Sequence, residues 1–192
     1  MQITLIRHGK PSSATSSAVN AVDYLKWIRR YNLSDVSASS RPKQINKQLE
    51  RHYLVSSDFN RAIHSTKIYT GRRPDTISRL YREMEIPRYK LPFKFAPMTW
   101  VYLCRILWML GLTGSFESYR LAKRRADKAA QTLIELANQH GSLVLFGHGY
   151  MNLHIRRILI KQGWLLHCKS NRYWGLSSLK SPKKRIADYP QG

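Results

Sequence analysis

Acidic residues are scarce in this sequence of 192 residues. Eleven Asp and Glu stand against 33 Lys and Arg, so the formal net charge is +22. Such a surface is expected to attract nucleic acid, anionic membrane lipid or another polyanion without much selectivity. The alternative is a bias of composition that serves no partner.

Cysteine is nearly absent as well, because Cys104 and Cys168 are the only two. Two cysteines give no disulfide framework and suit a reducing compartment. The chain enters an apolar run at Ile3, which leaves no room for a cleavable signal peptide, so a cytoplasmic protein is expected. No cofactor or metal site is predicted, since no ligand spacing such as His-x-x-x-His occurs among the histidines that carry no other motif. These are His52, His64, His140, His154 and His167.

No apolar run is long enough to span a bilayer comfortably. The most apolar stretch, residues 98–110, is short and carries Arg105 at its middle, which argues against a transmembrane helix. It is interpreted as a cap helix facing the substrate or as a core helix, with a membrane or dimer contact as the third possibility. The exposure of Trp100 and Trp108 separates these cases, because only exposed tryptophans would respond to lipid vesicles.

The remaining composition predicts one globular domain over residues 1–192. The chain is 43% hydrophobic and contains no long linker or repeat. Its pattern predicts an α/β fold with a mostly parallel sheet and helices on both faces. Strands are expected at residues 3–6, 53–56, 76–81, 143–146 and 172–179. The clearest helix is expected over residues 117–140, with an apolar stripe of Ala122, Ala126, Ala129, Leu133 and Ala137.

The most informative motif is Ile6-Arg7-His8-Gly9, at the end of the first apolar run. It places an arginine and an imidazole where a buried strand opens into a loop. Ligand sites of α/β proteins lie at such strand ends, and a guanidinium beside an imidazole suits a phosphate group there.

Three further segments supply matching groups. Arg61 follows the strand-like run 53–55 at the start of a helical stretch, where the helix N-terminus favours an anion. His148 lies between two glycines after the apolar run 143–146. Glu83 and Glu85 follow the strand-like run 76–78, and either could be a proton donor or an ion-pair partner for a nearby arginine. The plainer alternatives are an exposed helical residue for Arg61 and a packing role for His148.

With these segments in the same order, the chain resembles the histidine phosphatase superfamily, the phosphoglycerate-mutase-like proteins, from Ile3 to about Leu159. The resemblance implies that His8 accepts the phosphoryl group and that Arg7, Arg61 and His148 surround its oxygens. It makes Glu83 the proton donor and likens Phe116-Glu117-Ser118 to the Gly-Glu-Ser of the family, with the glycine displaced to Gly114. It also implies a three-layer α/β/α sandwich with a cap insertion at about 86–116.

The chemistry requires these residue types in any case. Two arginines can offer paired N–H donors to the phosphoryl oxygens, and their charge keeps His8 neutral enough to attack. A covalent phosphohistidine divides the reaction into two displacements. Glu83 can give a proton to the leaving oxygen and then activate water.

The sequence departs from mutase members at Lys10-Pro11-Ser12-Ser13, which replaces the acidic residue and serine that follow Arg-His-Gly there. This difference favours a phosphatase of the histidine acid phosphatase type, acting on a phosphorylated small molecule, over a phosphoglycerate-mutase-type phosphotransferase. A non-catalytic protein that binds polyanions or an anionic membrane surface on the same fold is the alternative from another class.

Overall fold

The computed structural model describes residues 1–13 and 17–182, and its centre is one six-stranded sheet of order β3-β2-β4-β1-β6-β5. Strands β1 to β4 run parallel to one another, whereas β6 runs antiparallel to β1 and β5 antiparallel to β6. The bounds are β1 Gln2–Arg7, β2 Tyr53–Ser57, β3 Thr76–Ser78, β4 Ser142–Gly147, β5 Leu165–Cys168 and β6 Leu176–Lys180.

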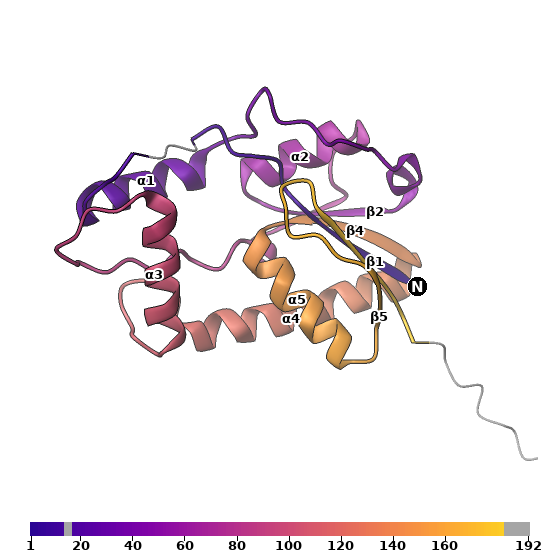
Figure 1. Ribbon diagram of the computed structural model, residues 1–192. Coiled ribbons are helices and arrows are strands. Elements are labelled where there is room, and N and C mark those ends of the chain that lie inside the picture. The colour runs from indigo at the N-terminus through magenta and orange to yellow at the C-terminus, as the bar shows by residue number, and fades with distance from the viewer. Residues whose placement is uncertain (14–16, 183–192) are drawn as a thin grey trace, which may run out of the picture.

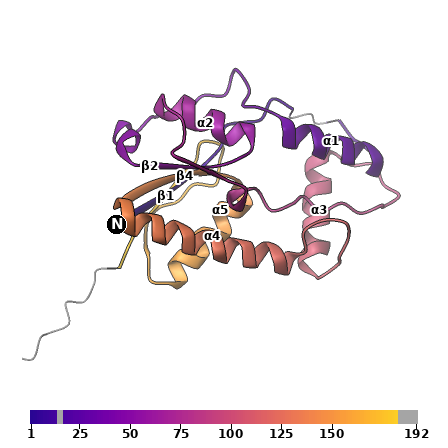
Figure 2. The same cartoon turned by 180° about the vertical axis from the view of Figure 1, so that it is seen from behind.

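Helices cover both faces of this sheet. Figure 1 shows α2 above the strands and α4 with α5 below them, and the view from behind in Figure 2 shows the same order. The α/β architecture with a mostly parallel sheet is therefore confirmed. The helices are α1 Ala21–Leu33, α2 Asn60–Thr70, α3 Pro97–Met109, α4 Tyr119–His140 and α5 Gly149–Lys161, with 3-10 turns at Lys47–Arg51 and Arg79–Tyr81.

The apolar runs of the sequence are continuous because the central strands are buried on both faces. In β4, Leu143 and Leu145 belong to the core shared with α4 and α5, whereas Val144 and Phe146 belong to the core on the α2 side. The predicted stripe of α4 from Ala122 to Ala137 is fully buried against the first of these cores.

Helices α1 and α3 lie at one end of the molecule, beyond the sheet (Figure 1), and pack around a third apolar cluster. Trp100 and Cys104 of α3 are fully buried there, and Trp108 reaches the main core. The opposite face of α3 exposes Tyr102 and Ile106. The run 98–110 is thus a half-buried helix, and no helix in the described part of the chain has the length and apolar character to cross a membrane.

Two strand predictions were wrong in extent. The strand expected over 76–81 ends at Ser78, whose side chain accepts a hydrogen bond from Leu80 N and starts a 3-10 turn. The strand expected over 172–179 begins only at Leu176, because the chain turns at Trp174, which has a φ of 61°.

Strand β5 was not predicted at all. It is the edge of the sheet, and each of its four residues is exposed, with Leu165 at 60%. The predicted domain of 1–192 and its cap at about 86–116 stay predictions, and residues 14–16 and 183–192 of that domain lie outside the described residues.

Candidate active site

The two motif histidines follow neighbouring strands. Strands β1 and β4 are paired in parallel with Arg7 opposite Gly147, so His8 and His148 leave the sheet side by side. His8 N donates to Gly147 O at 3.1 Å, and the two ring centroids are 5.0 Å apart. Both side chains are buried, with 1% and 0% exposure.

Arg61 joins them from the first turn of α2. Its side chain is fully buried, so it is not an exposed helical residue. Nε donates to His8 Nε2 at 3.3 Å, and Nη1 donates to the carbonyls of Tyr31 and Asn32. The buried Nη2 has no hydrogen-bond partner among the described residues. One guanidinium edge therefore remains available beside His8.

The hydrogen bonds of His8 define its tautomer. Nδ1 lies 2.7 Å from Gly9 O, and because a carbonyl only accepts, Nδ1 must carry the proton. Nε2 then holds the lone pair. Burial lowers the pKa of His8 well below its usual value, and the charges of Arg61 and Arg7 lower it further. The ring is a neutral base whose lone pair faces Arg61.

His148 is held by β2. Its Nε2 lies 2.6 Å from Ser57 Oγ, and its buried Nδ1 has no partner in the part of the chain that is described. Burial lowers the pKa of His148 well below its usual value, and the charge of Arg61 lowers it further. His148 is thus also neutral, and its buried Nδ1 is available to donate a hydrogen bond.

Arg7 completes this group of four, which we call the cage: Arg7, His8, Arg61 and His148. Its Nη1 donates to Asn171 O at 2.9 Å, and its guanidinium stacks on the Tyr173 ring at 4.1 Å. A Cβ on Gly149 would lie only 3.1 Å from Arg7 Nε, so the glycine permits this close approach. Tyr173 also lies 5.8 Å from the His8 ring and covers the cage from the loop before β6.

The two candidate carboxylates, Glu83 and Glu85, have different hydrogen-bond partners in the structure. Glu83 accepts hydrogen bonds from Tyr150 N and Met151 N, at the start of α5 directly after His148. Glu85 instead accepts from Glu117 N at 2.7 Å. The chain has left β3 before residue 83, so neither carboxylate lies on a strand. Glu83 is the carboxylate beside the cage.

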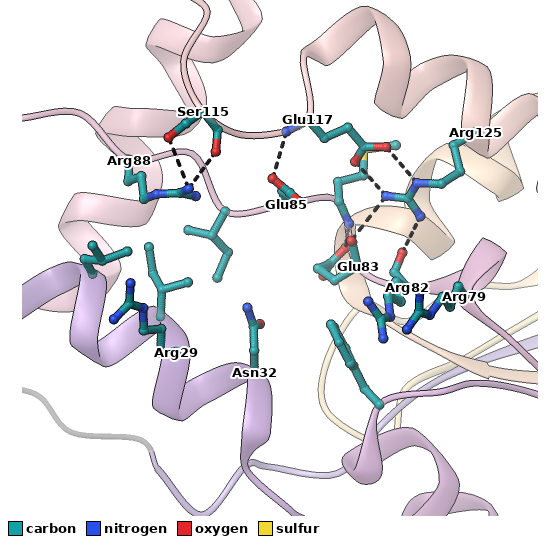
Figure 3. A pocket seen from close by; sticks show the side chains of 15 residues that line it. Arg29, Asn32, Arg79, Arg82, Glu83, Glu85, Arg88, Ser115, Glu117 and Arg125 are labelled. Carbon is teal, nitrogen blue, oxygen red and sulfur yellow. Dashed lines mark hydrogen bonds and ion pairs between the residues drawn. The ribbon is translucent and has the colours of Figure 1, made fainter.

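Glu117 is linked to the backbone of residues 80–83 through Arg125 of α4. The Arg125 guanidinium makes two hydrogen bonds of 2.7 Å to the Glu117 carboxylate and donates to the carbonyls of Leu80, Arg82 and Glu83. Figure 3 shows this bridge beside Glu83. The sequence marked Glu117 but carried no signal for Arg125, whose carbonyl partners lie 42 to 45 positions away along the chain.

Arg105 is the second contributor that sequence reasoning missed. It lies on the inner face of α3, donates to Met84 O at 2.7 Å and stacks between Trp108 and Tyr150. Burial lowers the pKa of Arg105, and the charge of Glu83 opposes that shift. Helix α3 is therefore attached to the segment that carries Glu83.

A cavity of about 730 Å³ opens beside Glu83. Its wall reaches Phe59, whose ring centroid lies 5.3 Å from that of His148. The cavity thus adjoins the cage without including His8. Within residues 1–13 and 17–182 no group of three or more His, Cys, Asp or Glu side chains is placed to hold a metal ion. The positive charge at the site comes from the arginines.

Known structures share this fold. The chain is similar to a phosphoserine phosphatase from Entamoeba histolytica, with a TM-score of 0.54 and 13% identity over 92% of this chain and 89% of that one. It is similar to a phosphoglycerate mutase from Thermus thermophilus, with a TM-score of 0.51 and 18% identity over 83% of this chain and 84% of that one. It is also similar to an open reading frame product from Mycobacterium tuberculosis, with a TM-score of 0.52 and 12% identity over 83% of this chain and 78% of that one.

No family model matches the chain, and no curated protein matches it in sequence. The likeness therefore rests on structure at low identity. The chain has the fold of the phosphoglycerate-mutase-like histidine phosphatases.

Proposed function

We propose that this protein is a phosphomonoesterase that works through a phosphohistidine on His8. The observation that carries the proposal is the neutral, buried His8, whose Nε2 lone pair faces Arg61. The buried Arg61 Nη2, Arg7 Nε and His148 Nδ1 have no partners among the described residues, which suits donors meant for an anion. Phosphoryl transfer depends mainly on such positioning and charge neutralisation.

In the first step, the Nε2 lone pair of His8 attacks phosphorus and the bond from phosphorus to the ester oxygen breaks. The phosphoryl group replaces Arg61 Nε at this lone pair, and Arg7, Arg61 and His148 bind its oxygens. Glu83 gives its proton to the leaving oxygen, which departs as an alcohol. Gly9 O keeps the Nδ1 proton in place and stabilises the positive charge that develops on the ring.

In the second step, water attacks the phosphohistidine from the side of Glu83. The carboxylate takes a proton from this water, the bond from phosphorus to nitrogen breaks, and inorganic phosphate leaves. The electron pair of that bond returns to His8, which restores the neutral base. The free thiols Cys104 and Cys168 suit a cytoplasmic setting for this reaction.

The test of the nucleophile uses para-nitrophenyl phosphate. His8→Ala should abolish its hydrolysis, and protein quenched without acid during turnover should carry phosphate on His8 in wild type only. His167→Ala is the matched control, because His167 is exposed on β5. Hydrolysis that survives in His8→Ala would refute the covalent mechanism. Phosphate binding without any hydrolysis by wild type would favour the non-catalytic binding protein.

The test of the proton donor compares leaving groups. Glu83→Gln should slow alkyl phosphates by about 10²- to 10⁴-fold and aryl phosphates much less, because only the poor leaving group needs a proton. Glu85→Gln is the matched control, since Glu85 faces Glu117 N. If Glu85→Gln shows this pattern and Glu83→Gln does not, the assignment is wrong.

A further inference from the structure

The cavity beside Glu83 carries information about the substrate, provided that the proposed phosphomonoesterase function holds. Its position next to the proton donor makes it the place for the leaving group. Its volume of about 730 Å³ falls in the range of small-molecule sites. Five arginines line it, as Figure 3 shows: Arg29, Arg79, Arg82, Arg88 and Arg125.

Two of these arginines are already committed to protein partners. Arg82 makes two hydrogen bonds of 2.6 Å to the Asp58 carboxylate. Arg125 uses its guanidinium on Glu117 and on backbone carbonyls. Arg79 lies near Asp58 at 3.6 Å, and its side chain is 83% exposed. These three do not leave a preorganised donor pair for a ligand.

Arg29 and Arg88 differ from the others. Arg29 makes no hydrogen bond or ion pair with any described residue, and Arg88 uses only Nη2, on Ser115. In Figure 3 both lie across the cavity from Glu83. The acid nearest to this side, Glu85, accepts a hydrogen bond from Glu117 N and pairs with neither of them. The far end of the cavity therefore holds two guanidinium groups without a counter-charge bound to them.

Part of the cavity wall is apolar. Leu25 and Ile28 of α1 and Ile86 line the cavity, and Ile28 and Ile86 belong to the cluster around α1 and α3. Such a wall suits a short carbon skeleton better than a second polar group. A ligand that fills the cavity would thus have an ester oxygen at Glu83, a carbon chain along the apolar wall and a group of opposite charge at the arginines.

We propose that the substrate is a small phosphomonoester that carries a second anionic group, and that Arg29 and Arg88 bind this group. A guanidinium gives two parallel N–H donors to a phosphate or carboxylate, which makes arginine suited to this role. The two residues set specificity and take no part in the bond changes at phosphorus.

The experiment compares 1,4-butanediol bisphosphate with 1,4-butanediol monophosphate, which have the same leaving oxygen and differ in the second anion. Wild type should show a kcat/KM for the bisphosphate about tenfold or more above that for the monophosphate, beyond the factor of about two for its two equivalent esters. The phosphate ester of 5-hydroxypentanoate forms a second arm, which distinguishes a carboxylate from a phosphate as the preferred anion.

The variant Arg29→Gln/Arg88→Gln should reduce this ratio to the statistical factor. Arg30→Gln should keep the wild-type ratio, because Arg30 is an exposed neighbour on α1 that does not line the cavity. A wild type that hydrolyses para-nitrophenyl phosphate but shows no preference for either dianionic substrate would overturn the inference. So would a double variant that retains the preference.

Failure of the proposed function gives a different result. In that case para-nitrophenyl phosphate is not hydrolysed, and calorimetric binding of the same two butanediol phosphates replaces kinetics. Tighter binding of the bisphosphate that disappears in the double variant would still support the anion site. Equal binding of both compounds would overturn it.

Discussion

The neutral histidines of the cage should make the stability of the folded protein depend on pH. In the folded state the pKa of His8 and of His148 lies well below 6.5 because of burial and the neighbouring arginines, whereas the unfolded chain binds protons near pH 6.5. Below this pH the unfolded state holds more protons, so the free energy of unfolding falls as the pH falls. From pH 7 to pH 5.5 each histidine should cost about 1 kcal/mol, and the pair about 2 kcal/mol.

Urea unfolding at a series of pH values measures this slope. His52 and His154 also have a lowered pKa through burial and add to it in the same direction, so the decisive quantity is the difference between variants. His8→Asn and His148→Asn should each remove about 1 kcal/mol of the pH dependence, whatever their effect at pH 7. Exposed His167→Gln is the control. Equal slopes in wild type and both cage variants would refute the neutral, buried cage.

Three other predictions follow from the site and its surroundings. Glu117→Gln should destabilise the fold by about 1.5–3 kcal/mol in urea unfolding, because Arg125 loses a charged partner, whereas exposed Glu135→Gln should change it by less than about 0.5 kcal/mol. Chelators should leave phosphatase activity unchanged in a steady-state assay, since the cage arginines supply the charge. Trp100 and Trp108 are buried, so tryptophan emission should not shift with anionic vesicles, and any binding seen by sedimentation should disappear as salt rises.

The central fold could be predicted because burial on two faces leaves a strong local signal. The apolar runs within β1, β2 and β4 have few polar residues. Each run ends near a glycine, serine or histidine at the carboxyl end of its strand. Strand β5 leaves no such signal, because it is an exposed edge held mainly by backbone pairing with β6. The chain turns after Ser78 because the Ser78 side chain accepts a hydrogen bond from Leu80 N. The alternation of residues along the expected strand does not predict this turn.

The cage itself could also be predicted, since each member lies at or shortly after the end of a strand that the sequence marks. The roles of Arg105, Arg125 and Tyr173 could not be predicted from the sequence. Each acts through a tertiary contact with a residue at least 20 positions away, such as Arg125 with Arg82 O or Tyr173 with the Arg7 guanidinium. Nothing in the local sequence distinguishes these side chains from the many other basic and aromatic residues of the chain.

The open edge at β5 has a consequence for how copies of the protein behave together. A strand with free backbone groups and exposed leucines, here Leu165 and Leu166, is a template for pairing with a second edge about 4.8 Å away. The charge of +22 keeps such edges apart through mutual repulsion. Added salt shortens the range of that repulsion, the Debye length, from about 8 Å at physiological ionic strength to about 3 Å at 1 M. Concentrated salt should therefore favour self-association of this protein.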